Sequence, residues 1–337
     1  MSVDVEEWFH VLESPAAPSL ETWDSLESRL EPNMDRILEL LHGHGVRATF
    51  FWVGWLAERY KSLLKRCCDA GHEIASHGYH HVLPHQVGLD RFRGDIDKAK
   101  KVLEDVSGRA VLGFRVAGFG IKSDTRWAFD VIREVGYIYD SSVLPAQGGH
   151  GGISDSLLGP YFVETSSGYL LEVPMSVVTF FGHRTPMFGG GYLRLAGRPM
   201  LKWGIKRLHA LGQPLIVYFH PREIDPDQPR LPLRRLRRFK YYVNLRSTMP
   251  KLKWLCRDYS FGTMTELVES RIKSFCHEDE DVQVVDLQGE RVGGLPSPAT
   301  DEPMDPVDKR AVRKRPTVIE KALADFLETY PKTLITA

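Results

Sequence analysis

The chain of 337 residues has few cysteines, no long apolar segment and no excess of charge of either sign. Without a run of about 18 apolar residues, it offers no candidate for a helix that spans a membrane. Its 44 basic and 44 acidic side chains cancel, so overall charge favours neither nucleic acid nor an anionic membrane as a partner. With 42% apolar and 26% charged residues, the composition is that of an ordinary globular protein.

The few cysteines indicate a reducing compartment. Two of the four, Cys67 and Cys68, are adjacent, which excludes a disulfide framework for a chain of this length. The first seven residues contain neither the basic nor the apolar segment of a secretory signal, so we expect a cytoplasmic protein. A strand-like segment with two carboxylates stands within the first six residues, which leaves open a gene start further upstream.

Helical and strand patterns alternate along residues 36–219. Residues 47–53 are a nearly continuous apolar and β-branched run typical of a buried parallel strand. Further strands are expected over residues 72–76, 110–115, 137–140, 170–178 and 214–219. Helical spacing occupies residues 36–44, 56–70, 89–107, 125–135 and 198–211. Repeated strand and helix units over about 220 residues predict an α/β fold with a parallel (β/α) barrel, and a doubly wound sheet is the competing architecture.

The composition changes beyond residue 275. Acidic, proline-containing and basic runs follow one another over residues 277–315, as is typical of a linker or a disordered tail. Capping-box form and a one-sided apolar pattern predict an amphipathic helix over residues 317–330, which packs on its own domain or on a partner. We therefore expect a barrel over residues 1–275 and a charged tail over residues 276–337.

The most informative spacing joins two histidines to two carboxylates. His77 and His81 stand at positions i and i+4 just beyond a predicted strand, where two imidazoles can reach one metal ion. Asp4 and Glu6 alternate along a candidate strand, so both carboxylates point to one face of a sheet. One carboxylate would complete a metal site of two histidines and one carboxylate, and the other would act as a base. Each motif alone is commoner as ordinary surface residues; together they predict a divalent metal site.

Seven segments, in order along residues 1–265, carry a resemblance to a known family. They are Asp4-Val-Glu-Glu-Trp-Phe9, Ala48-Thr-Phe-Phe51, Gly71-His-Glu-Ile-Ala-Ser-His77 with His81, Gly113-Phe-Arg115, Tyr139-Asp-Ser-Ser142 with Pro145, Gly189-Gly-Gly-Tyr-Leu-Arg194, and His220-Pro-Arg-Glu-Ile-Asp-Pro226. The chain thereby resembles the polysaccharide deacetylases of carbohydrate esterase family four, especially the branch found with bacterial exopolysaccharide loci. The resemblance implies a distorted seven-stranded (β/α) barrel, here with a C-terminal extension, that hydrolyses acetamide groups of N-acetylated sugars with a divalent metal ion.

The resemblance also implies roles for residues that match the family's motifs. His77, His81 and Glu6 resemble the metal ligands, and Asp4 resembles the general base that deprotonates the attacking water. Many members have two adjacent aspartates where this chain has Asp4 and Val5. The choice of base and ligand between Asp4 and Glu6 therefore stays open.

Three further positions match the family's catalytic residues. His220 resembles the general acid that protonates the leaving amine, and Asp140 resembles the acid that pairs with this imidazole and keeps it protonated. Arg115 resembles the arginine that orients the base. Two departures stand nearby: the loop from Arg115 to Gly118 lacks the proline of many relatives, and Arg222 stands where close relatives have tryptophan. The second departure suggests that a platform for stacking a sugar ring has been lost.

Aromatic and basic residues add weaker signals about the substrate. Six aromatic side chains flank the motifs and are candidate sugar contacts, namely Trp8, Phe9, Tyr79, Phe119, Phe188 and Tyr192. The basic segment 230–246 is either a solvated helix face or a contact for an acidic glycan or a phosphate-bearing lipid carrier. Peripheral membrane contact therefore stays open.

We predict a metal-dependent N-deacetylase that acts on an N-acetylated polysaccharide, oligosaccharide or precursor, with no nucleic acid partner. Zinc is the expected ion, and cobalt, nickel and manganese suit the same ligands. Two rival functions stay open: hydrolysis of a cyclic amide or ureide on the same barrel, and sugar binding without turnover. Nothing in the sequence indicates an oligomeric state.

Overall fold

The computed structural model describes residues 1–276 and 283–293. One sheet has the strand order β10-β1-β2-β3-β4-β5-β7-β6-β11-β12. The first seven strands in this order run parallel to one another. They are β10 (Tyr218–Phe219), β1 (Ser2–Val5), β2 (Thr49–Trp52), β3 (Glu73–Ser76), β4 (Gly113–Phe114), β5 (Tyr139–Asp140) and β7 (Gly168–Glu172). Seven parallel strands connected by helices confirm the predicted α/β class and the expected number of barrel strands.

The remaining strands extend the sheet or form a separate hairpin. β6 (Tyr161–Thr165) is antiparallel to β7, β11 (Val284–Val285) is parallel to β6, and β12 (Arg291–Gly293) is antiparallel to β11. β8 (Val178–Phe180) and β9 (His183–Thr185) form the hairpin. Neither the hairpin nor the two late strands are predicted by the sequence pattern.

The chain that follows β7 reaches the start of β10. The Ser176 hydroxyl donates a 2.9 Å hydrogen bond to the Pro214 carbonyl oxygen and accepts a 2.8 Å bond from the Ile216 amide. Within residues 1–276 and 283–293, no backbone ladder joins β7 to β10. This side-chain bridge, which we call the seam, links the two ends of the row of parallel strands.

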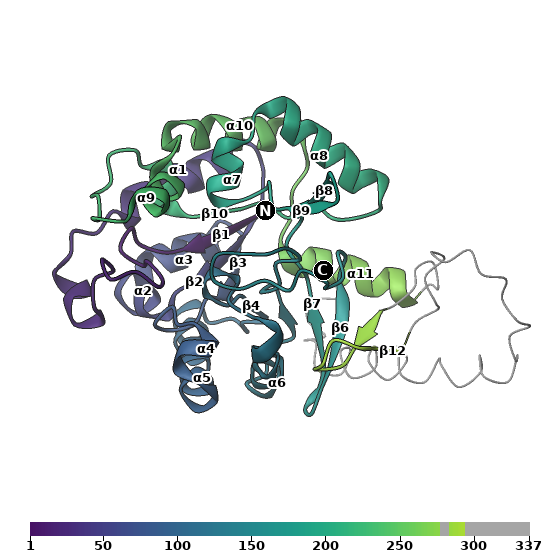
Figure 1. Ribbon diagram of the computed structural model, residues 1–337. Coiled ribbons are helices and arrows are strands. Elements are labelled where there is room, and N and C mark those ends of the chain that lie inside the picture. The colour runs from purple at the N-terminus through teal and green to yellow at the C-terminus, as the bar shows by residue number, and fades with distance from the viewer. Residues whose placement is uncertain (277–282, 294–337) are drawn as a thin grey trace, which may run out of the picture.

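Helices lie outside the strands (Figure 1). The helices that alternate with the strands or close the fold are α1 (Leu30–Gly43), α2 (Gly54–Arg59), α3 (Lys61–Asp69), α5 (Leu89–Ser107), α6 (Trp127–Glu134), α8 (Arg198–Ala210), α10 (Thr248–Asp258) and α11 (Met264–Cys276). Three shorter helices are α4 (Pro84–Val87), α7 (Gly190–Leu195) and α9 (Arg235–Tyr242). No helix in the described part of the chain is long and apolar enough to cross a membrane.

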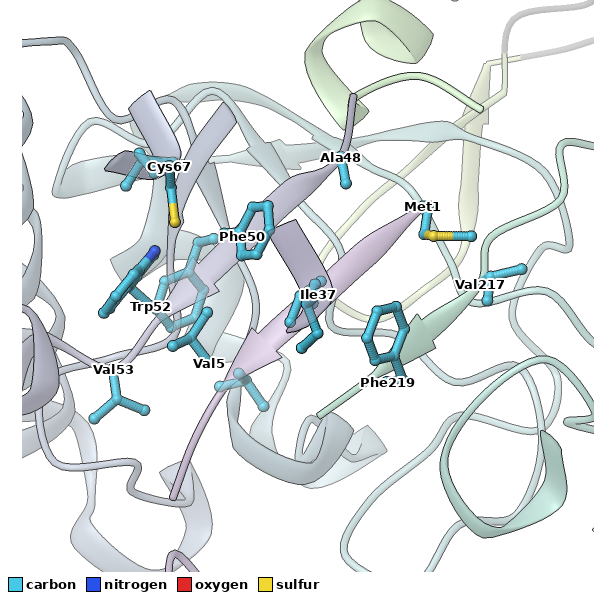
Figure 2. Close-up of a cluster of buried hydrophobic side chains, with 14 of the residues drawn as sticks. Met1, Val5, Ile37, Ala48, Phe50, Trp52, Val53, Cys67, Val217 and Phe219 are labelled. Atoms are coloured by element: carbon cyan, nitrogen blue, oxygen red, sulfur yellow. The ribbon is translucent and has the colours of Figure 1, made fainter. Parts of the chain in front are cut away.

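Alternation along the strands separates an outer face that packs on the helices from an inner face that carries polar residues beside a second apolar cluster, which includes Phe51, Ala75 and Leu171. Figure 2 shows Val5 of β1, Phe50 of β2 and Phe219 of β10 in one buried cluster with Ile37 of α1. These outward side chains anchor the helices to the sheet, because burying them removes apolar surface from water. The alternate residues of β1, among them Asp4, face the other way. Asp4, which the sequence predicts as a site residue, therefore lies on the inner face.

The predicted elements differ from the observed ones mainly in length. The helix expected over residues 56–70 is two helices, α2 and α3, because Tyr60 leaves helical geometry at φ −111° and ψ 46°. The strand expected over residues 214–219 has only two residues in the ladder, Tyr218 and Phe219. Apolar runs mark what is buried, and the strand ladder covers only part of each run.

The described part of the tail joins the sheet. Val284 and Val285 of β11 are buried and pair with Phe162 and Val163 of β6. The compositional change at residue 275 therefore does not coincide with the end of the sheet. The division into a barrel over residues 1–275 and a tail over residues 276–337 stays a prediction, and the helix predicted over residues 317–330 lies outside the described residues.

Candidate active site

A buried ion pair stands at the centre of the inner face. Arg115, directly after β4, is fully buried and donates from Nη1 to Asp4 Oδ1 at 2.6 Å and to Ser2 Oγ at 2.9 Å. Its other nitrogens donate to Ser141, from Nε to the carbonyl oxygen and from Nη2 to the hydroxyl, both at 3.1 Å. The guanidinium thus fixes one oxygen of Asp4 and leaves Oδ2 directed elsewhere. This is the orientation that the sequence resemblance implies for Arg115.

Glu6, His77 and His81 converge on one point. Glu6 Oε1 lies 3.1 Å from His77 Nε2 and 2.9 Å from His81 Nε2. His77 Nδ1 lies 2.7 Å from the Arg115 carbonyl oxygen, which suits a proton on Nδ1 and leaves Nε2 as the ligand atom. Ligand atoms of these three side chains all lie within 4.8 Å of one another. A carboxylate and two imidazoles in this arrangement fit a divalent transition-metal ion.

A strained turn presents His81. Its φ of 58° is in the left-handed region, where a residue with a Cβ is disfavoured. Asp95 of α5 holds the turn, since its carboxylate accepts from the Tyr79 amide at 2.7 Å and from the His80 amide at 3.0 Å. Such strain persists where surrounding contacts enforce it, as they do at ligand sites. Asp95 is a positioning residue that the sequence analysis missed.

His220 lies on the opposite side of the two carboxylates, immediately after β10. Its Nε2 is 3.5 Å from Glu6 Oε1 and 3.9 Å from Asp4 Oδ2, and its Nδ1 is 3.4 Å from Glu223 Oε2. Burial acts against the charged imidazole, but the carboxylates of Glu6 and Glu223 outweigh it and raise the pKa of His220 to about 10. His220 is therefore held as a cation and a proton donor in this arrangement.

Glu223 is the acid that pairs with His220, and the prediction that Asp140 does so is wrong. Although burial favours its neutral form, Arg194 at 3.2 Å and His220 hold the pKa of Glu223 at about 2. The sequence carried a signal for this pairing, because Glu223 stands three residues after His220, the spacing of a capping box. In the structure the Glu223 carboxylate accepts a 3.2 Å hydrogen bond from the His220 amide.

Asp140 faces away from the site because strand side chains alternate. Its neighbour Tyr139 points inward and donates to Glu73 at 2.6 Å, which turns Asp140 to the outer face. There Asp140 accepts from the Ser142 hydroxyl at 2.6 Å and is paired across the ladder with Glu172. Burial and this like-charged neighbour raise the pKa of Glu172 well above its usual range, and burial raises that of Asp140 to about 6. Burial of the pair thus favours the protonated form of Glu172.

A cavity of about 220 Å³ opens over these residues. Its floor includes Asp4, Glu6, His81 and His220, and its walls include Gly118 of the loop after β4. The backbone of Gly118 therefore borders the cavity. Of the six aromatic residues predicted to contact sugar, Phe119 and Tyr192 line the cavity. The other four are packed in the core, namely Trp8, Phe9, Tyr79 and Phe188.

Comparison with known proteins agrees with this geometry. Residues 17–138 match the family described as "Polysaccharide deacetylase", and residues 141–269 match a domain of unknown function, DUF3473. A peptidoglycan-N-acetylglucosamine deacetylase of Bacillus cereus is 34% identical over 94 residues, which are 28% of this chain and 34% of that protein. A peptidoglycan deacetylase of Helicobacter pylori is 26% identical over 114 residues, 34% of this chain and 38% of that protein. The chain thus aligns with little more than a third of either protein.

The fold agrees with a solved structure as well. A crystal structure from Mycobacterium smegmatis, described as a polysaccharide deacetylase, superposes with a TM-score of 0.54 at 18% identity, over 81% of this chain and 90% of that one. Residues 17–138 thus match the polysaccharide deacetylase family, and the solved structure shares the fold. The chain contains a polysaccharide deacetylase domain, as the sequence motifs predict.

Proposed function

We propose that the protein is a metal-dependent N-deacetylase that hydrolyses acetamide groups on an exopolysaccharide or its precursor. The observation that carries the proposal is that Glu6 lies close both to the histidine pair His77 and His81 and to His220. Its Oε1 lies within 3.1 Å of both His77 and His81 and 3.5 Å from His220. Metal ligands, base and acid thus meet within one cavity.

The geometry supports Glu6 as the ligand and Asp4 as the base. Asp4 Oδ1 is occupied by Arg115, whereas Oδ2 faces the cavity side toward His220. Glu6 shares its Oε1 with the two imidazoles that would hold the ion. When bound, a divalent ion supplies positive charge that polarises the acetamide carbonyl and makes water more acidic.

The side chains then divide the proton transfers. Asp4 takes the proton of the water that adds to the acetamide carbon, and Arg115 keeps the carboxylate aimed at that water. The backbone amide of Gly118 offers a hydrogen bond to the developing oxyanion. His220 delivers its proton to the nitrogen as the carbon–nitrogen bond breaks, so that acetate and a free amine leave.

Acetate release tests the proposal. The purified protein is assayed on a chitin tetrasaccharide before and after removal of metal with a chelator, and after return of zinc, cobalt, nickel or manganese. We expect activity to disappear with the metal and to return with at least one ion. Asp4→Asn should abolish release, and substitution of the exposed Asp124 by Asn is the matched control. Undiminished release by the metal-free protein or by Asp4→Asn would refute the mechanism.

A further inference from the structure

One buried arginine of the cavity leaves two of its three guanidinium nitrogens without a hydrogen-bond acceptor. Arg222 lies in the 3-10 helix Pro221–Ile224 directly after His220, is only 7% exposed and lines the cavity. Its Nε and Nη1 are buried without a hydrogen-bond partner, and its guanidinium forms no ion pair with any residue that the structure describes. A buried cation left in this state is costly, so an acceptor from a ligand would stabilise it.

The other two buried arginines of the site have hydrogen-bond acceptors. Arg115 donates to Asp4, Ser2 and Ser141. Arg194 donates to the carbonyl oxygens of Tyr241 and Lys240 at 2.8 and 2.9 Å and pairs with Glu223. Every donor group in Arg222 is chemically equivalent to these. Its unpaired state is therefore specific to its position and not a property of buried arginines in this fold.

Nearby carboxylates are already engaged. Asp4 is paired with Arg115, Glu6 faces His77 and His81, and Glu223 is shared between Arg194 and His220. These three are also the only acidic residues that line the cavity within the described chain. No protein carboxylate is left over to neutralise Arg222.

An aromatic ring holds the Arg222 guanidinium in place without providing hydrogen-bond acceptors in its plane. The Arg222 guanidinium carbon lies 4.0 Å from the centre of the Tyr241 ring. The ring attracts the cation through its face, but the N–H bonds lie in the guanidinium plane and still need acceptors. Lys240, which also lines the cavity, is exposed and adds a second positive charge. Arg222 and Lys240 thus bring two cationic side chains to the lining of the cavity.

We propose that Arg222 binds an oxyanion carried by the glycan substrate, a carboxylate or a phosphate near the acetamide, and that the enzyme therefore prefers acidic N-acetylated glycans. The proposal rests on the proposed function. Charge-assisted hydrogen bonds from a guanidinium to such a group are stronger than neutral ones.

Calorimetric binding to the full-length protein tests the preference. The probes are a tetrasaccharide of alternating glucuronate and N-acetylglucosamine, N-acetylglucosamine 1-phosphate, and the neutral chitin tetrasaccharide. We expect one acidic probe to bind at least about ten-fold more tightly than the neutral one. The first probe identifies a carboxylate ligand and the second a phosphate. Equal affinity of the wild-type protein for all three overturns the proposal.

Variants assign the preference to Arg222. Arg222→Gln should lose most of the ratio between acidic and neutral affinities, and Arg222→Lys should retain part of it. The matched control is Arg230→Gln, because Arg230 stacks 4.2 Å from the Tyr242 ring but is exposed and outside the cavity. If folded Arg222→Gln keeps the wild-type ratio of acidic to neutral affinities, the assignment is refuted. If Arg222→Gln does not fold, the assignment is refuted when Arg222→Lys keeps the wild-type ratio and Arg230→Gln loses it.

The two proposals fail differently. Acetate release from the neutral tetrasaccharide without any affinity for acidic probes would refute the anion site and keep the deacetylase. Preferential binding of an acidic probe without acetate release from any probe would refute the deacetylase and keep the anion site.

Discussion

Arg115 donates from Nη1 to Oδ1 of Asp4 at 2.6 Å, and neither side chain is exposed to solvent by more than 3%. A buried pair of this kind orients the base, yet it is costly to break, because removal of one partner leaves the other charge uncompensated. The same contact thus couples catalysis to folding.

Arg115→Met should therefore destabilise the protein by about 3–5 kcal/mol and abolish acetate release. Urea unfolding measures the stability. The double variant Arg115→Met with Asp4→Asn should be less destabilised than the sum of the two single variants, because it leaves no lone charge. Additive losses would show that the pair is not coupled.

His77→Ala and His81→Ala should each remove bound metal while leaving the fold largely intact, since both ligands stand on a turn beyond β3. Elemental analysis of the purified variants measures the metal. His209→Ala, on the exposed end of α8, is the control and should keep the wild-type content. Full occupancy in either ligand variant would place the ion elsewhere.

Glu223→Gln and Asp140→Asn distinguish the true partner of His220. We expect Glu223→Gln to lower kcat by at least about ten-fold with little change in KM, because the proton donor matters in the transition state. Asp140→Asn, on the outer face, should leave both constants near their wild-type values. The reverse pattern would restore Asp140 to the mechanism. His220→Ala should lower turnover far more than it weakens substrate binding.

The pair of Asp140 and Glu172 predicts a pH dependence of stability. Burial raises the pKa of both carboxyl groups above their values in the unfolded chain. Above about pH 4 the folded state therefore keeps protons that the unfolded chain has lost. The free energy of unfolding should then fall by about 1.4 kcal/mol per pH unit for each extra proton bound, up to the folded pKa values. Glu172→Gln mimics the protonated acid, so its stability relative to wild type should increase from pH 4 to 7. A constant difference over this range would contradict the assignment.

Removal of the chain after Ser274 should preserve acetate release, because no described residue beyond that point lines the cavity. The truncated protein should melt at a lower temperature, since it loses the buried Val284 and Val285. Thermal unfolding and the acetate assay together measure the two effects. Loss of activity in a folded truncated protein would assign the tail a role in the site.

Motif order in the sequence was enough to predict which residues meet. The pair Asp4 and Glu6, the pair His77 and His81, and His220 come from three distant parts of the chain, and each group stands at or beyond the end of a parallel strand. Since such ends gather at one edge of the sheet, their convergence follows from the alternation of strands and helices. The number of parallel strands was likewise implied by the resemblance.

The error at Asp140 has a geometric cause. A strand of two residues places one side chain inward and one outward, and the sequence Tyr139-Asp140 does not say which. Polarity would place Asp140 in a polar interior. In the structure Tyr139 points inward instead, because its hydroxyl can donate a hydrogen bond to Glu73 there. Asp140 consequently points outward.

The seam at Ser176 bears on how this enzyme can change its substrate. Where neighbouring strands are joined by backbone hydrogen bonds, a segment inserted between them must preserve the register of those bonds. Between β7 and β10 the described chain has no such ladder; the Ser176 hydroxyl links the two ends, and the Phe188 carbonyl oxygen and an isolated bridge from Gly189 to Tyr218 return the chain to β10. The chain between these contacts is therefore less constrained in register. This chain leaves the barrel, builds α7 and supplies Gly191 and Tyr192 to the cavity before it returns. Gly191 and Tyr192 of this segment line the cavity, but Arg194 pairs with Glu223, which lies 3.4 Å from His220. Grafts between residues 177 and 213 that retain Arg194 should therefore alter the cavity wall and keep the pairing of Glu223 with His220.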